Sequence, residues 1–100
     1  MAIDLDTVLS RGFDAGNYCN AYETQDYDRA LSIRTAKPRP GVRAELQTAW
    51  QVAFTLGFFG SYEFDEMGEH EDTYREALAS AHGQRCVELG FGHRDESDES

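Results

Sequence analysis

The segment "GVRAELQTAWQVAFTLGFFGSYE", residues 41–63, is the most apolar part of the chain and constrains its fold more than any other. Its apolar residues recur with the 3.6-residue period of an α-helix. The stripe comprises Val42, Leu46, Ala49, Trp50, Ala53 and Gly57, and Phe54, Phe58 and Phe59 widen it. A helix that is apolar over so much of its surface has to be covered by other elements. We therefore expect this helix, including Trp50, at the centre of the core.

Residues 4–23, "DLDTVLSRGFDAGNYCNAYE", predict a helix that begins at Asp4 or Asp6 as its N-cap. Leu5, Val8, Leu9, Gly12, Phe13, Gly16 and Cys19 form one stripe of this helix. Each glycine costs about 1 kcal/mol relative to alanine in a helix interior. Gly12 and Gly16 lie on the same face, so we expect a second helix to approach closely there.

Residues 26–36, "DYDRALSIRTA", predict a shorter helix that ends before Pro38, and Pro40 can open the central helix. After the central helix, Met67 and Gly68 interrupt the helical pattern. Residues 71–83, "EDTYREALASAHG", then predict a last helix with Gly83 as its C-terminal cap and His82 beside the negative end of the helix dipole. Residues 85–91, "RCVELGF", fit either a helical turn or a short strand.

These patterns predict one all-α domain, a small bundle of about four helices over residues 1–92, followed by a disordered acidic tail at residues 93–100. A faint internal repeat relates "FDAGNYCNAYE" to "FTLGFFGSYE". It suggests that the two helices pack as an antiparallel pair across a pseudo-dyad. Chance similarity between two amphipathic helices explains the repeat equally well.

The net charge of −10 limits the partners that the chain can bind. It repels duplex DNA and favours a basic protein surface, such as a groove that normally holds nucleic acid. Eight of the nine basic residues are arginine. Adaptation to high salt would also produce an acidic, lysine-poor chain, and this alternative stays open. The sequence does not decide the oligomeric state, which is either a monomer or a homodimer.

The chain contains neither an apolar signal region after Met1 nor a run of about 20 apolar residues that could cross a membrane. We therefore expect a cytoplasmic protein with no membrane partner. Cys19 and Cys86 are expected to be reduced thiols in the core, although a disulfide between them is the alternative.

No catalytic or metal-binding motif is specific enough to indicate an enzyme. The run "EHED", residues 69–72, has one histidine and no HExxH spacing, and the chain has no CxxC pair. On an α-helix His70 would face Glu66 and Tyr74 rather than its immediate neighbours. We therefore expect no catalytic residues, no metal and no cofactor.

The acids are concentrated in the stretch from Glu63 to Glu76, where Arg75 is the only basic residue. Because aromatic residues lie among the acids, the stretch is typical of a protein-binding surface. The expected contact residues are Tyr62, Glu63, Phe64, Asp65, Glu66, Glu69, Glu71, Asp72, Tyr74 and Glu76. A solvated surface with no partner is the alternative.

Basic residues are concentrated between Arg29 and Arg43, where no acid interrupts them. We expect a second contact here, made by Arg34, Lys37, Arg39 and Arg43, with an acidic protein patch or with exposed RNA.

Two resemblances bear on function. "RGFDAG", Arg11 to Gly16, followed by Trp50, resembles ribosome modulation factor, which implies a ribosome- or RNA-associated protein that uses the basic segment Arg29–Arg43. In its size, acidity and arginine bias, the chain resembles phage-encoded anti-CRISPR proteins, without a shared motif. That resemblance implies a non-enzymatic inhibitor in a bacterial host, which binds the nucleic-acid groove of a CRISPR effector complex by mimicking nucleic acid. We favour this second reading.

Overall fold

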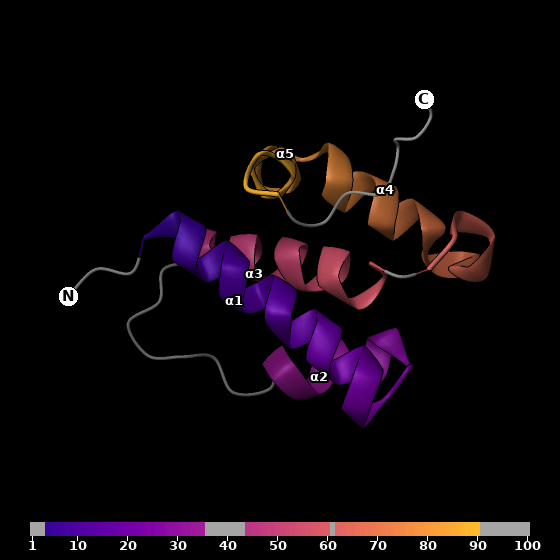
Figure 1. The fold of residues 1–100 in the computed structure, drawn as a ribbon. Coiled ribbons are helices and arrows are strands. Elements are labelled where there is room, and N and C mark those ends of the chain that lie inside the picture. Colours follow the sequence, from indigo (N-terminus) through magenta and orange to yellow (C-terminus); the bar gives the residue numbers. More distant parts are fainter. Residues whose placement is uncertain (1–3, 36–43, 61, 91–100) are drawn as a thin grey trace.

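A computed structural model describes residues 4–35, 44–60 and 62–90 of the chain (Figure 1). The helices are α1 (Leu5–Tyr18), α2 (Tyr27–Thr35), α3 (Ala44–Phe58), α4 (Glu71–Ala79) and α5 (Ala81–Glu88). A π-helical turn, η1 (Cys19–Glu23), follows α1, and two 3-10 turns, η2 (Phe64–Glu66) and η3 (Gly68–His70), precede α4. The described part of the chain contains no strand, so the predicted all-α class is confirmed, with five helices instead of about four.

Three predicted features lie outside the described residues. They are the acidic tail at residues 93–100, the opening of the central helix at Pro40 and the basic residues Lys37, Arg39 and Arg43.

Helix α3 lies at the centre of the fold, with α1 on one side and α4 and α5 on the other (Figure 1). Every residue from 53 to 59 is buried, as the apolar stripe predicted. Trp50 differs from the expectation, because it is only partly buried. Its ring stacks on Phe54 with 5.1 Å between the centroids, so it covers the edge of the core.

Glycines allow α1 and α3 to pack with their backbones in contact. A Cβ atom on Gly12 would lie 2.5 Å from the carbonyl oxygen of Trp50. A Cβ atom on Gly16 would collide with the carbonyl oxygen of Phe54 and lie 2.6 Å from the amide nitrogen of Phe58. The predicted close approach of a second helix to the glycine face of α1 is therefore confirmed.

The contacts between α1 and α3 are reciprocal. Gly16 abuts the carbonyl of Phe54, and Gly57 abuts the carbonyl of Phe13. In the faint repeat, Gly16 corresponds to Gly57 and Phe13 corresponds to Phe54. The pair therefore has a pseudo-dyad, but the two helices run parallel, since Gly12 meets residues 50 and 53 while Gly16 meets residues 54–58. The antiparallel prediction is therefore wrong: α1 and α3 are not consecutive helices, since η1 and α2 lie between them in the chain.

The last predicted helix is two helices. Ser80 has extended backbone angles, φ −68° and ψ 163°, and its hydroxyl accepts a hydrogen bond from the amide of Gly83 at 3.0 Å. Gly83 is thus buried in the first turn of α5 and does not cap α4, and a Cβ atom there would collide with the carbonyl oxygen of Ala77. His82 lies near the start of α5, so the predicted dipole interaction at a helix C-terminus is also wrong. The ambiguous segment from residue 85 is helical as far as Glu88.

Helix α2 is attached to α3 through Tyr27. The Tyr27 and Thr55 hydroxyl oxygens lie 2.7 Å apart in the core. Because the Thr55 hydroxyl donates its proton to the carbonyl of Gln51, the Tyr27 hydroxyl is the donor to Thr55. Burial raises the pKa of Tyr27, since the phenolate would lose its hydration there.

Among the described residues, no helix combines the length and the apolar character needed to cross a membrane.

Candidate functional site: an acidic surface

The acidic segment, residues 62–76, consists of η2, η3 and the first part of α4. Glu66 stabilises its first turn, because its carboxylate accepts a hydrogen bond from the amide of Glu63 at 2.9 Å. Gly68 has φ +59°, which allows the chain to change direction between the two 3-10 turns. The segment therefore has a defined backbone although few of its side chains are buried.

Six carboxylates of this segment are exposed: Glu63, Asp65, Glu66, Glu69, Asp72 and Glu76. Within the described part of the chain, none of the six forms an ion pair with lysine or arginine. Glu71 is the exception, since it is partly buried and accepts a hydrogen bond from Arg75 at 2.7 Å. The guanidinium of Arg75 also lies 4.1 Å from the centroid of the Phe64 ring. The only cation of the segment is thus already engaged.

The outer ridge of α4 carries two of these acids. Tyr74 and Ala77 are buried and define the inner face of α4. Asp72 and Glu76 are exposed and lie two residues to either side of Tyr74, about half a turn of helix away. Their carboxylates therefore project from the side of α4 opposite the core.

The aromatic residues of the segment support the surface to different degrees. Tyr62 and Phe64 are partly buried, and the Tyr62 hydroxyl accepts a hydrogen bond from the side-chain amide of Asn20 at 2.9 Å. Tyr74 is 0% exposed and packs edge-on against Phe64 and Phe59. Tyr74 is therefore a core residue beneath the surface, and the prediction that it contacts a partner is wrong. The sequence signal for this burial is the helical spacing of Tyr74 with Ala77 and Leu78, which places Tyr74 on the apolar stripe of the helix.

Helix α2 adds an acid that the sequence did not connect with this segment. Ligand atoms of Asp28, Glu69 and His70 all lie within 4.8 Å of one another. The His70 ring is held by Tyr27 and Phe59, with centroid distances of 5.1 and 5.7 Å. No sequence signal links residue 28 with residue 69, because only the packing of α2 beside η3 brings them together.

The same three side chains offer one nitrogen and two carboxylate groups, which is a donor set that a divalent cation accepts. Exposed acidic groups often lie this close without a metal. The expected partners of His70, Glu66 and Tyr74, are not the observed ones. His70 lies in a 3-10 turn, where the α-helical spacing used for that expectation does not apply.

Of the basic segment, the structure describes Arg29 and Arg34. Arg34 donates from Nε to Cys19 Sγ at 3.2 Å and from Nη2 to Glu23 Oε2 at 2.9 Å. Its guanidinium therefore joins η1 to α2, but the residue remains exposed, so the contact of Arg34 with a partner stays a prediction. Arg29 is exposed.

Both cysteines are free thiols in the core, with exposed fractions of 1% for Cys19 and 0% for Cys86. Burial raises the pKa of Cys19 and raises the pKa of Cys86 to about 11. Each sulfur is therefore protonated at neutral pH, whereas a nucleophilic cysteine requires the thiolate.

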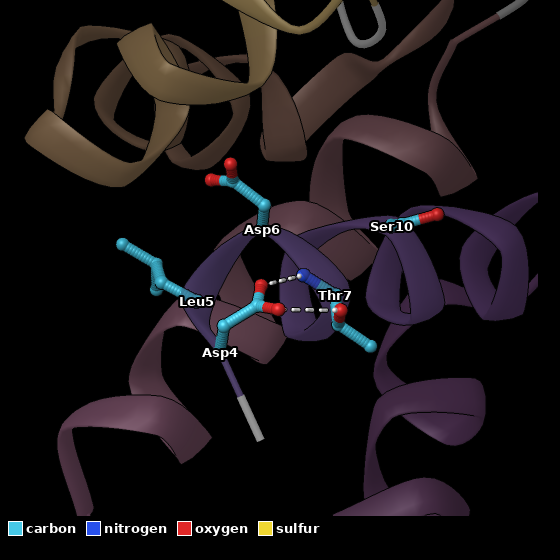
Figure 2. Close-up of a pocket in the computed structure, with 5 residues that line it drawn as sticks. All are labelled: Asp4, Leu5, Asp6, Thr7 and Ser10. Atoms are coloured by element: carbon cyan, nitrogen blue, oxygen red, sulfur yellow. Dashed lines mark hydrogen bonds between the residues drawn. The ribbon is translucent and has the colours of Figure 1, made fainter. Parts of the chain in front are cut away.

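An open hollow of about 520 Å³ lies at the start of α1 (Figure 2). Asp4 uses both carboxylate oxygens to bind the amide and hydroxyl of Thr7, at 2.9 and 3.2 Å. Asp6 points toward α5, where it accepts hydrogen bonds from Arg85 at 2.9 and 2.7 Å that lower its pKa. Both carboxylates at this hollow are therefore engaged within the fold, Asp4 with Thr7 and Asp6 with Arg85.

Comparison of the chain with known protein families, curated proteins and solved structures found no match.

Proposed function

We propose that the protein is a non-enzymatic inhibitor that places its acidic surface in the basic, nucleic-acid-binding groove of another protein. The observation that carries this proposal is the set of six exposed carboxylates in residues 62–76 that have no lysine or arginine partner among the described residues. Such carboxylates can bind the arginine and lysine side chains that otherwise hold phosphates. Nucleic acid and the inhibitor then compete for one groove.

The backbone of the acidic surface favours binding because it is already ordered. Glu66 caps its first turn, and Tyr62 is tied to Asn20 in η1. A surface that is organised before binding loses less conformational entropy in the complex. Asp28 extends the negative surface onto α2, so a partner can contact two elements at once.

The state of the two cysteines favours a binding role over nucleophilic catalysis by a thiol. The two thiols are buried and have raised pKa values. Of the polar residues around the hollow at the start of α1, Asp4 caps the helix through Thr7 and Asp6 forms an ion pair with Arg85.

From its resemblance in character to anti-CRISPR proteins, we expect the groove to belong to a guide-loaded CRISPR effector complex of a bacterial host. A ribosome- or RNA-associated role would instead use the basic segment Arg29–Arg43. The engagement of Arg34 with Glu23 and Cys19 leaves that alternative with fewer free cations.

The test titrates the protein into a purified, guide-loaded CRISPR effector complex with fluorescently labelled target DNA. Binding of the DNA is followed by anisotropy. We expect displacement of the DNA to reach completion at a fixed molar ratio of inhibitor to effector, because the inhibitor occupies the groove and does not turn over. We also expect inhibition to weaken as salt increases, since charged contacts are screened.

The variant Glu69→Lys/Glu76→Lys should lose at least about tenfold in inhibitory affinity, since each lost pair with a basic residue contributes about 1–3 kcal/mol. Glu69 is 84% exposed at its side chain, and Glu76 is exposed on α4, so the fold should survive. Gln25→Lys/Ser32→Lys/Thr48→Lys/Gln51→Lys adds the same four units of positive charge at exposed residues outside the acidic segment and should inhibit like the unmodified protein. Equal inhibition by both variants, or inhibition at substoichiometric ratios, would contradict the proposal.

A further inference from the structure

Two exposed tyrosines form a pair at the junction of α1 and η1. Tyr18 is 52% exposed and Tyr22 is 77% exposed, and their ring centroids lie 5.1 Å apart with an interplanar angle of 45°. Among the described residues, neither hydroxyl has a hydrogen-bond partner. Most of the other aromatic residues are packed into the core, so this pair is an exception that requires explanation.

The backbone that carries the pair is held on two sides. The amide of Thr24 donates to the carbonyl of Cys19 at 2.8 Å, which closes the wide π-helical turn. Arg34 of α2 binds Cys19 and Glu23 on one side of this turn, and Asn20 binds Tyr62 on another. The tyrosines thus stand on an ordered support, although their rings are exposed.

The position of Asn20 also places the pair relative to the acidic surface. Asn20 faces Tyr62, at the start of the acidic segment. Tyr18 and Tyr22 lie two residues to either side of Asn20, which is roughly half a helical turn away. The tyrosine pair therefore belongs to a different face of the molecule from Tyr62, and Asp14 is exposed one turn before Tyr18 on the same stripe.

The charge of the protein indicates what this face can bind. With a net charge of −10, the molecule repels a second copy of itself and also repels the phosphates of a nucleic acid. It attracts cationic groups. Exposed tyrosine rings bind guanidinium groups on their faces, and phenol oxygens and a carboxylate accept hydrogen bonds from guanidinium N–H groups.

The molecule contains an example of this interaction. The guanidinium of Arg75 lies 4.1 Å from the centroid of the Phe64 ring and also donates to Glu71. The stripe of Asp14, Tyr18 and Tyr22 has the same components, aromatic rings with a nearby carboxylate. In the described part of the chain no arginine lies over either tyrosine ring.

We propose that Asp14, Tyr18 and Tyr22 form a second contact site that binds arginine side chains of a basic protein partner. This inference rests on the proposed function, because it adds a contact for the same class of partner. The sequence predicted a second contact through the basic residues between Arg29 and Arg43. The site proposed here is aromatic and acidic instead, like the first contact surface.

The test compares two probes of equal charge, a ten-residue all-arginine peptide and a ten-residue all-lysine peptide. Affinities are measured by calorimetry at low salt, and the tyrosine ring resonances are followed by NMR. We expect the arginine peptide to bind about two- to fivefold more tightly and to shift the Tyr18 and Tyr22 ring signals, because a planar guanidinium stacks on aromatic rings better than an ammonium group.

Tyr18→Leu/Tyr22→Leu should abolish the preference for arginine, whereas Tyr18→Phe/Tyr22→Phe should retain most of it because the rings remain. Ile33→Ala removes an equally exposed apolar side chain of α2 and should leave the preference unchanged. The inference is overturned if the two peptides bind equally to the unmodified protein, or if the leucine variant keeps the preference. Ring shifts caused by a thymidine oligonucleotide, which would mark a nucleic-acid site, would overturn it as well.

A separate arm distinguishes this inference from the proposed function. Glu69→Lys/Glu76→Lys should weaken both peptides by a similar factor and leave their affinity ratio unchanged. If that variant binds both peptides like the unmodified protein, the acidic surface fails while the ratio still reports on the tyrosines. If the ratio is one in every variant, the tyrosine site fails while the acidic surface is unaffected.

Discussion

Gly12, Gly16 and Gly57 have one physical role, which is to let two helix backbones touch. The stripe of α1 predicted this role for Gly12 and Gly16, because two interior glycines on one helix face require compensation by close packing. For Gly57 the stripe predicted burial only. The contact of Gly57 with the carbonyl of Phe13 is identified only by the structure, in which α1 and α3 pack with reciprocal contacts.

We predict that Gly16→Ala destabilises the protein by about 2 kcal/mol. The added methyl group would collide with the carbonyl of Phe54 and with the amide of Phe58, so α1 and α3 would have to separate. Urea unfolding followed by circular dichroism measures the free energy of unfolding.

Gly60→Ala is the matched control, since the nearest atom to its Cβ would be the carbonyl oxygen of Leu56 at 3.3 Å. We expect its free energy of unfolding to change by no more than about 0.5 kcal/mol. Equal stability of the two variants would contradict the close packing of α1 and α3.

The helix boundaries were predicted well where local residues determine them and poorly where they do not. Asp4 caps α1, and α2 begins one residue after the predicted start. The break at Ser80 was missed, because residues 71–83 have a continuous helical pattern and a glycine that resembles a C-terminal cap. The break brings Gly83 against the carbonyl of Ala77, where a residue with a Cβ atom would collide.

We predict that Ser80→Ala destabilises the protein by about 1 kcal/mol, because α5 loses the side chain that accepts the amide proton of Gly83 at 3.0 Å. Urea unfolding measures the effect. Ser32→Ala changes an exposed serine inside α2 and should be close to neutral or slightly stabilising, since alanine is the better helix former. A neutral Ser80→Ala variant would show that the break between α4 and α5 does not depend on this cap.

The electrostatic asymmetry of the molecule follows from how its arginines are used. Arg34, Arg75 and Arg85 form ion pairs with Glu23, Glu71, Asp6 and Glu88. The acids of η2 and η3 have no such partners in the described part of the chain. Two of these pairs, Glu71–Arg75 and Arg85–Glu88, have helical spacing in the sequence, whereas Arg34–Glu23 and Arg85–Asp6 join segments that only the fold brings together.

We predict that salt stabilises the folded protein. Raising sodium chloride from about 0.1 M to about 1 M shortens the screening length from roughly 10 Å to roughly 3 Å and should increase the free energy of unfolding by about 1 kcal/mol. The reason is that a net charge of −10 repels itself in the compact state. Urea is the appropriate denaturant because it is uncharged.

Glu69→Lys/Glu76→Lys makes the net charge less negative by four and should show a smaller response to salt. If salt lowered the stability of the unmodified protein, the ion pairs of the three arginines would outweigh the repulsion between acids. That result would contradict a folded state dominated by unpaired negative charge.

Periodicity and local chemistry were enough to predict the all-α class, the central position of α3, the glycine contact of α1 and the interruption at Gly68. These features depend on residues within a few positions of each other, whose helical spacing is visible in the chain. The parallel direction of α1 and α3, the engagement of Arg34 with Cys19 and the meeting of Asp28 with His70 depend on segments far apart in the chain. Such contacts arise when the helices pack around α3, because packing determines which side chains remain on the surface to meet a partner.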